Sequence, residues 1–208
     1  MKTCVIFGAG DRPEKLPDLP ENAFFIASDG GYLTMRAFGI QPDLFVGDGD
    51  SLPGGLPEDV PAVKLPVVKD VTDTDAAVAE GFKRGCDDFL LLGCMGGRLD
   101  HTFANVTLLA RLSKKGCKAK MTDGKTAIEA VTDGSLSLPA RKSGTVAVFA
   151  FSDVCDGVTI RGLQYELTDG RLTADFALGV SNAYSGKAAE ISVKKGTLIV
   201  VYDEGNCA

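Results

Sequence analysis

Short hydrophobic runs alternate with longer amphipathic stretches over the first 124 residues of the chain. The hydrophobic runs have the length of strands. Several lack the alternation of a strand with one exposed face, so we expect them to be buried on both faces of a sheet. These predicted strands are residues 4–7, 23–27, 44–46, 62–65, 89–92 and 118–122.

The amphipathic stretches between these runs have the pattern of helices. The predicted helices are residues 32–38, 75–84 and 101–115. Each is followed by a glycine (Gly39, Gly85 or Gly116) at the position where a left-handed residue ends many helices. Strands that alternate with helices predict a mostly parallel sheet covered by helices, so we expect an α/β domain over residues 1–124.

The pattern changes after about residue 125, where the runs become shorter and no further helix is predicted. The expected strands are residues 145–151, 158–161, 165–168, 171–175, 188–193 and 197–202. Asp169-Gly170 predicts a two-residue hairpin, and Lys195-Gly196 predicts another tight return. We therefore expect an all-β sandwich or barrel over residues 125–208.

The composition excludes several classes of protein. The chain has 208 residues, 45% hydrophobic and 24% charged, and no apolar run nears the roughly 18 residues that span a membrane. The apolar run after Lys2 is too short for a secretory signal, so we expect a cytoplasmic protein with no membrane partner. A net charge of −6, with only the basic pairs Lys114-Lys115 and Lys194-Lys195, argues against nucleic acid as a partner.

Cysteine and histidine usage argues against a structural zinc site. The six cysteines form no C-x-x-C pair, and His101 is the only histidine. We expect all six to be reduced thiols: Cys4, Cys86, Cys94, Cys117, Cys155 and Cys207. His101 begins a predicted helix and is interpreted as a polar N-terminal residue of that helix, not as a catalytic base.

Polar motifs in the first half fall at the ends of predicted strands. They are Ser28 to Gly31, Gly47 to Ser51, Lys69 to Asp75, and Gly96 to His101. Because the carboxyl ends of parallel strands lie at one edge of a sheet, we expect these segments to converge on one crevice.

The turn Gly47-Asp48-Gly49-Asp50-Ser51 carries two carboxylates at positions i and i+2, which project to the same side of an extended chain. Two such groups repel each other unless a cation lies between them, so the turn is either a solvated loop or part of a metal site. The converging motifs favour the metal site, because they contribute many hard oxygen ligands of the kind that suit Mg²⁺ and a phosphate substrate. The aspartates concerned are Asp29, Asp48, Asp50, Asp70, Asp73, Asp75 and Asp100, accompanied by Lys69 and Arg98.

Gly96 and Gly97 precede a predicted helix, where backbone N–H groups can approach an anion closely. Arg98 can bind two phosphate oxygens at once. The familiar nucleotide motifs are missing: no G-x-x-x-x-G-K-[ST] occurs, and the segment from Gly8 lacks the third glycine of a dinucleotide fingerprint.

The motifs together resemble those of the thiamine pyrophosphokinase family, in order and at suitable spacing over nearly the whole chain. They are Asp29-Gly30-Gly31, Gly47-Asp48-Gly49-Asp50-Ser51, Asp70-Val71-Thr72-Asp73, Gly97-Arg98-Leu99-Asp100-His101, Gly162-Leu163-Gln164-Tyr165 and Gly179-Val180-Ser181-Asn182. The resemblance implies a homodimer that uses Mg²⁺ to transfer a diphosphate from ATP to the hydroxyl of thiamine, giving thiamine diphosphate and AMP. The thiamine pocket would be shared between the α/β domain of one subunit and the β domain of the other, which would also serve dimerisation.

The resemblance also implies roles for individual residues. The metal ligands would be Asp48, Asp50 and Asp73, and the catalytic residues Asp73, Arg98 and Asp100. ATP would be bound by Asp29, Gly30, Gly31, Ser51, Asp70, Thr72, Gly96, Gly97 and Arg98. Thiamine would be bound by Asp100, Ser181, Asn182 and Tyr184. Asp100 would either accept a hydrogen bond from the alcohol or bind the aminopyrimidine, and both roles stay open.

The sequence departs from the family pattern at three places. Gly49 replaces the aromatic residue common between the two carboxylates, and Lys69 stands where glutamine is frequent. The chain has no Trp to stack on thiamine, and Tyr184 is the substitute by position. Two alternatives therefore remain, namely a diphosphokinase for another hydroxymethyl heterocycle such as a pterin, and a non-catalytic nucleotide or thiamine sensor.

Overall fold

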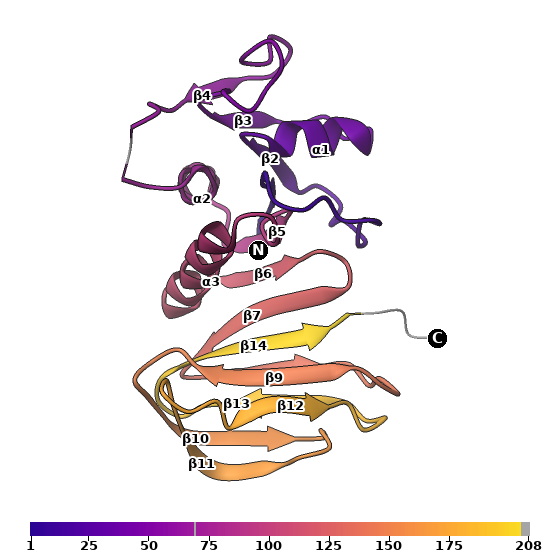
Figure 1. Ribbon diagram of the computed structural model, residues 1–208, viewed down its shortest axis with the longest axis vertical. Coiled ribbons are helices and arrows are strands. Elements are labelled where there is room, and N and C mark those ends of the chain that lie inside the picture. Colours follow the sequence, from indigo (N-terminus) through magenta and orange to yellow (C-terminus); the bar gives the residue numbers. More distant parts are fainter. Residues whose placement is uncertain (69, 205–208) are drawn as a thin grey trace. The chain divides into compact units, whose positions relative to one another are not determined.

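The computed structural model describes residues 1–68 and 70–204 (Figure 1). Lys69 and Cys207, both named above, lie outside the described residues. The chain divides into two compact units, one of Met1–Leu108 with Cys117–Gly124 and the other of Leu109–Gly116 with the chain from Lys125 onward.

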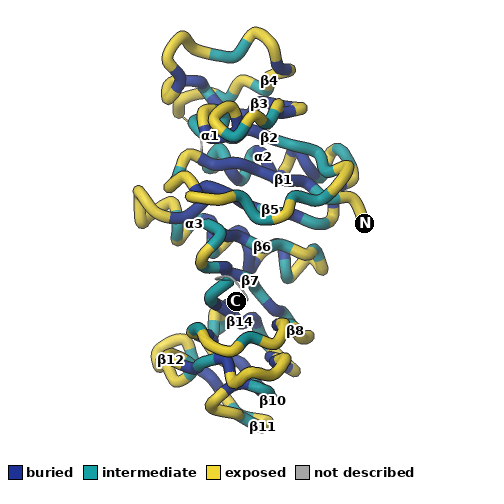
Figure 2. The backbone as a smooth tube through the Cα atoms, turned by 90° about the vertical axis from the view of Figure 1, so that its right-hand side faces the viewer, coloured by how far each residue is buried: buried dark blue, intermediate teal, exposed yellow. Residues whose placement is uncertain are grey.

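The first unit contains a parallel sheet. Its strands are β1 (Thr3–Phe7), β2 (Phe24–Ser28), β3 (Leu44–Gly47), β4 (Ala62–Lys64), β5 (Asp88–Leu92) and β6 (Lys118–Thr122). They lie in the order β6-β5-β1-β2-β3-β4, and every neighbouring pair is parallel. The central strand β1 is buried from Cys4 to Phe7 (Figure 2). The α/β class predicted for this half is confirmed.

Helices cover both faces of this sheet. They are α1 (Gly31–Ala37), α2 (Asp73–Lys83) and α3 (Leu99–Lys114) (Figure 1). Met35 of α1 packs in one cluster with Val5 and Phe7 of β1. Successive strand residues point to opposite faces, and the neighbouring Cys4 lies against Gly81 of α2. A Cβ at Gly81 would be 3.3 Å from the Cys4 sulfur, so glycine lets α2 lie close to the sheet.

The second unit is all-β, as predicted. Its strands are β7 (Thr126–Thr132), β8 (Ser135–Leu138), β9 (Thr145–Ala150), β10 (Val154–Arg161), β11 (Leu167–Thr173), β12 (Gly179–Ala183), β13 (Ala189–Ser192) and β14 (Thr197–Asp203). They form the antiparallel arrays β12-β9-β14-β7 and β11-β10-β13-β8. Alternate residues of both arrays, such as Val148, Leu198 and Ile160, share one hydrophobic core.

The hairpin predicted at Asp169-Gly170 is wrong. Both residues lie inside β11, where the pairing with β10 shifts register on each side of Val158. Asp169 adopts a φ of +52°, the left-handed conformation that Asp and Gly tolerate in turns and also in bulges. The same pair of residue types therefore accommodates a bulge here instead of a chain reversal.

The described residues contain no helix long and apolar enough to cross a membrane. Five cysteines of the described residues are thiols outside any disulfide, namely Cys4, Cys86, Cys94, Cys117 and Cys155. Burial raises the pKa of the Cys94 thiol to about 12, so this side chain is a poor nucleophile.

Candidate functional site

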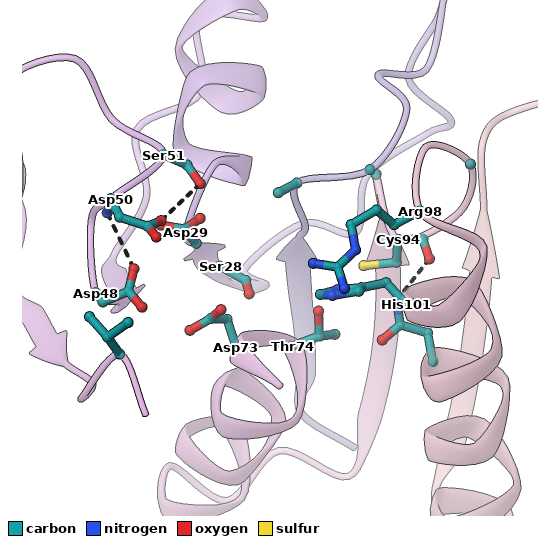
Figure 3. A pocket seen from close by; sticks show the side chains of 16 residues that line it. Ser28, Asp29, Asp48, Asp50, Ser51, Asp73, Thr74, Cys94, Arg98 and His101 are labelled. Carbon is teal, nitrogen blue, oxygen red and sulfur yellow. Dashed lines mark hydrogen bonds between the residues drawn. The ribbon is translucent and has the colours of Figure 1, made fainter. Parts of the chain in front are cut away.

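A cavity of about 480 Å³ opens at the carboxyl ends of the strands in the first unit. Figure 3 shows Asp29, Asp48, Asp50 and Ser51 on one side, Cys94, Arg98 and His101 on the other, and Asp73 and Thr74 between them. Of the residues predicted for the site, those lining the cavity are Asp29, Asp48, Asp50, Ser51, Asp73, Gly96 and Arg98. The expected convergence of strand-end motifs is thus present in the geometry.

Three carboxylates form a cluster at one end of the cavity. One oxygen from each of Asp29, Asp48 and Asp50 lies within 4.8 Å of the others, a spacing that suits a shared cation. Two hydrogen bonds within the turn stabilise its conformation. The Asp50 N–H donates to Asp48 Oδ1 at 3.2 Å, and the Ser51 hydroxyl donates to Asp50 Oδ1 at 3.2 Å (Figure 3).

Asp29 is the most informative member of this cluster. Its residue is 7% exposed, and its Oδ1 is buried without a hydrogen-bond partner among the described residues. A buried carboxylate oxygen left in this way is costly unless a cation or a ligand donor meets it, so the cluster fits a divalent metal. Asp29 also has a φ of +47°. Residues other than glycine seldom adopt this conformation, and those that do are often found at functional sites.

Asp73 is the first residue of α2 and lines the same cavity, but it is not part of the three-carboxylate cluster. The sequence assigned the metal to Asp48, Asp50 and Asp73 and gave Asp29 to ATP. The placement of Asp29 follows from the pairing of β2 with β3, which aligns Ser28 with Val46 and puts the two strand ends side by side. In the sequence, Asp29 could be recognised only by its position at the end of a predicted strand. Placing it beside Asp48 and Asp50 also requires knowing that β2 lies next to β3.

A glycine-rich loop forms the other end of the cavity. Gly93, Gly96 and Gly97 have φ values of +60°, +73° and +58°, which few other residues adopt without strain. The loop that follows β1 packs directly on it, and a Cβ at Gly10 would lie 2.5 Å from the Met95 carbonyl oxygen. Gly10 is therefore required for this close approach and not for a dinucleotide.

Arg98 and Asp100 form an ion pair at the start of α3. The guanidinium donates from Nε to Oδ1 at 3.2 Å and from Nη2 to Oδ2 at 2.6 Å, while the two side chains are 71% and 65% exposed. The hydrogen bonds from Arg98 lower the pKa of Asp100, and the same contact raises the pKa of Arg98. Arg98 lines the cavity together with the exposed His101, whereas Asp100 is not among the lining residues.

The remaining residues predicted to bind ATP do not line the cavity. Gly31 starts α1 so close to β1 that a Cβ there would lie 1.8 Å from the Phe7 carbonyl oxygen. Thr72 caps α2, because its hydroxyl accepts a hydrogen bond from the Asp75 N–H at 3.1 Å. Gly30 is half-buried, and Asp70 and Gly97 are exposed.

The residues predicted for thiamine lie in the second unit, apart from Asp100. Ser181 is exposed on β12 with a φ of +62°. Asn182 is 4% exposed and holds the main chain of Tyr165: its Oδ1 accepts from the Tyr165 N–H at 2.9 Å, and its Nδ2 donates to the Tyr165 carbonyl at 2.7 Å. Tyr184 is 5% exposed within the core, with the guanidinium of Arg141 over its ring.

Tyr165 is a residue that the sequence assignment left out. Tyr165 is 62% exposed, although the buried Asn182 hydrogen-bonds to both its main-chain N–H and its carbonyl oxygen. The motif Gly162-Leu163-Gln164-Tyr165 contained the signal, but exposure could not be read from it. An exposed aromatic side chain on a fixed main chain is suited to stacking on a heterocycle.

Two family models match most of the chain. Residues 18–121 match the family model described as "Thiamin pyrophosphokinase, catalytic domain", and residues 135–198 match "Thiamin pyrophosphokinase, vitamin B1 binding domain". The chain is similar to the thiamine pyrophosphokinase of Bacillus subtilis, with 28% identity over 97% of this chain and 98% of that protein.

Two solved structures show the same fold over all or nearly all of the chain. The thiamine pyrophosphokinase structure from Bacillus subtilis has a TM-score of 0.85 at 26% identity and covers 97% of this chain and 99% of its own. The structure from Geobacillus thermodenitrificans has a TM-score of 0.84 at 25% identity and covers both chains completely, at 100% each.

Proposed function

The chain belongs to the thiamin pyrophosphokinase family, and on that basis we propose that it transfers a diphosphate from ATP to the hydroxyl of thiamine, giving thiamine diphosphate and AMP. One observation carries the proposal at the level of the site. The cluster of Asp29, Asp48 and Asp50, with its unpartnered buried oxygen, shares a cavity with Arg98 and the glycine-rich loop. A cation site that faces a phosphate site is what transfer from ATP requires.

We assign Mg²⁺ to the oxygens of Asp29, Asp48 and Asp50, with Asp73 at the edge of the same site. When bound there, Mg²⁺ would neutralise charge on the ATP phosphates. Ser51 stays in the proposed ATP site because it lines the cavity beside Asp50.

Arg98 and the backbone N–H groups around Gly96 would bind phosphate oxygens across the cavity from the acidic cluster. Transfer to an alcohol depends mainly on holding the attacking and leaving oxygens in line with phosphorus, and both sides of the cavity serve this positioning. To bind phosphate, Arg98 would exchange its contact with Asp100 for one with the substrate. Asp100 would then be free to accept a hydrogen bond from the alcohol or to bind the aminopyrimidine.

The thiamine pocket is proposed to include Ser181, Asn182 and Tyr184, with the Tyr165 ring as an additional stacking surface. In the proposal a second copy of the chain completes the site. Phe176 and Leu178, just before β12, are 66% and 55% exposed. Exposed apolar residues often mark a surface that a partner protein covers, which supports the second copy. A cytoplasmic location fits the free thiols of the described residues.

The decisive assay is incubation with ATP, Mg²⁺ and thiamine, followed by chromatography of the products. AMP together with thiamine diphosphate supports the proposal, and ADP, or no thiamine-dependent turnover, contradicts it. Replacing thiamine by a hydroxymethylpterin tests the other diphosphokinase, and binding of both substrates without products would identify a sensor.

The aromatic assignment has its own test. Tyr165→Ala should raise the KM for thiamine roughly 2- to 10-fold, the value of one aromatic contact, and leave the KM for ATP unchanged. Tyr165→Phe is the matched control, because it keeps the aromatic ring and removes only the hydroxyl, so its KM for thiamine should stay near that of the wild type. If Tyr165→Ala leaves the KM for thiamine unchanged, the exposed ring does not contact thiamine.

A further inference from the structure

Asn105 is a polar residue on the buried face of α3. It is 5% exposed, and Leu108, Leu109 and Leu112, which follow it at helical spacing, are 4%, 0% and 1% exposed. This position would ordinarily take a hydrophobic side chain. Asparagine is a weaker helix former than leucine, and its amide must find a partner when it is buried.

The partner of Asn105 is the main chain of the glycine-rich loop. Its Nδ2 donates to the carbonyl oxygen of Cys94 at 2.8 Å, and this hydrogen bond is buried. Asn105 also lines the cavity, as Gly96 and Arg98 do. The amide thus ties α3 to the loop that carries the phosphate-binding groups.

The carbonyls of this loop are satisfied in an unbroken series. Leu92 O, Gly93 O and Met95 O accept from the N–H groups of the loop after β1, at 2.8, 2.7 and 2.8 Å. The donors are Gly8, Gly10 and Asp11. Cys94 O is the one carbonyl in the series that points to the helix side, and Asn105 satisfies it.

We infer that Asn105 is a positioning residue, which fixes the Cys94 carbonyl and thereby holds Gly96 and Arg98 where they meet the ATP phosphates. The inference rests on the proposed function for the identity of the ligand. A loop with three left-handed glycines has many accessible conformations, so a fixed one requires ties on both sides. A leucine at 105 would leave Cys94 O unpaired, and a carboxylate would repel it.

The test compares Asn105→Leu and Asn105→Asp with the wild type, and with Thr107→Val as control. Thr107 is exposed on the same helix, and its hydroxyl donates to the Phe103 carbonyl oxygen at 3.1 Å. Both Asn105 variants should lower kcat/KM for ATP roughly 10- to 100-fold, the usual effect of removing a residue that orients a ligand group, with the KM for thiamine within about 2-fold of wild type. Calorimetry should show that both Asn105 variants bind Mg²⁺-tripolyphosphate more weakly than the wild type does.

A double-mutant cycle with Arg98→Ala separates positioning from general structural support. If Asn105 acts by holding Arg98, the effect of Asn105→Leu on tripolyphosphate binding should largely disappear in the Arg98→Ala background. An equal effect in both backgrounds would overturn the inference, as would a folded Asn105→Asp enzyme with kcat/KM within about 2-fold of wild type. If Asn105→Leu fails to fold, Asn105→Asp, which keeps the shape, decides.

The binding measurement also keeps this inference separate from the proposed function. A wild-type protein with no thiamine-dependent turnover would contradict the function. If that protein still bound tripolyphosphate, and if Asn105→Leu weakened this binding only when Arg98 was present, the role of Asn105 would still be supported.

Discussion

The two ends of the cavity satisfy their polar groups in opposite ways. At the acidic end, Asp29 keeps a buried oxygen without a partner in the described structure, so a cost in stability is present before any ligand binds. At the loop end, four consecutive carbonyls are paired, and the charge of Arg98 is neutralised by an exposed neighbour. A cation can therefore bind at the acidic end without displacing a partner of the Asp29 oxygen. At the loop end, Arg98 must exchange Asp100 for a phosphate. The difference predicts where substitutions change activity alone and where they change stability too.

The largest effect is expected at the loop end. Arg98→Ala removes the only arginine or lysine among the described residues that line the cavity, and turnover should fall on the order of 10³-fold, as for other arginines that stabilise phosphoryl transfer. Melting temperature should stay near that of wild type because the side chain is exposed. Steady-state kinetics and thermal melts measure both, with Arg161→Ala, an exposed arginine of β10, as control. Turnover within tenfold of wild type would remove Arg98 from the phosphate site.

The acidic end should show the reverse combination. Asp29→Asn should lower turnover roughly 10²- to 10³-fold and, in the absence of Mg²⁺, raise the melting temperature by about 2–4 °C, because a buried charge without a partner is removed, worth about 1 kcal/mol. Mg²⁺ should raise the melting temperature of the wild type and not of the variant.

Thermal melts with and without Mg²⁺ measure this difference, and Asp175→Asn, an exposed carboxylate of the second unit, is the control. A variant that is less stable than the wild type without Mg²⁺ would show that Asp29 is not strained by its burial.

A smaller effect is expected where α2 enters the cavity. Thr72→Ala removes the cap that holds the first turn, including Asp73, and should lower the free energy of unfolding by about 1 kcal/mol. The KM for ATP should rise a few-fold because Asp73 is less firmly held. Denaturant unfolding and kinetics on Thr72→Ala and Thr72→Ser provide the measurement. Serine keeps the hydroxyl, so a serine variant as impaired as alanine would show that the cap is not responsible.

The smallest effect concerns the ion pair of Arg98 with Asp100. The pKa of Asp100 is lowered in the folded state, so the pair stabilises the fold above the unfolded pKa of Asp100 and loses that contribution as pH falls through the folded value. Both groups are exposed, so Asp100→Asn should leave the melting temperature near neutral pH almost unchanged. Melts of both proteins between acidic and neutral pH test this. If the wild type melted at a much higher temperature than Asp100→Asn at neutral pH, the ion pair would be structural and not an exchangeable contact.

The sequence was sufficient for the class of fold, because the class depends on local patterns of hydrophobic residues. Unbroken apolar runs identified the parallel strands. The spacing of Asp48 and Asp50 alone left a solvated loop and a metal site open, and only the other strand-end motifs favoured the metal site. The alignment of Asp29 with this pair depends on β2 lying beside β3, which is a property of strand order. No local pattern contains that information.

Burial was the other property that could not be predicted. Asn105 reads as one more polar residue in an amphipathic helix, yet it is 5% exposed and bonded to Cys94. Tyr184 and Tyr165 are the same residue type in the second half, but their exposures are 5% and 62%. Which tyrosine is covered depends on the packing of the two antiparallel sheets, and the choice of stacking residue depends on it in turn.

The contact between the loop after β1 and the loop after β5 has a consequence for motion. Loops at ligand sites usually exchange their amide hydrogens early. Here the N–H groups of Gly8, Gly10 and Asp11 continue the hydrogen bonding of β1 with β5 beyond the last strand residue. We expect these three amides to exchange as slowly as those of β1, although they belong to no strand. The floor of the cavity would then behave, on the timescale of minutes to hours, as an extension of the sheet.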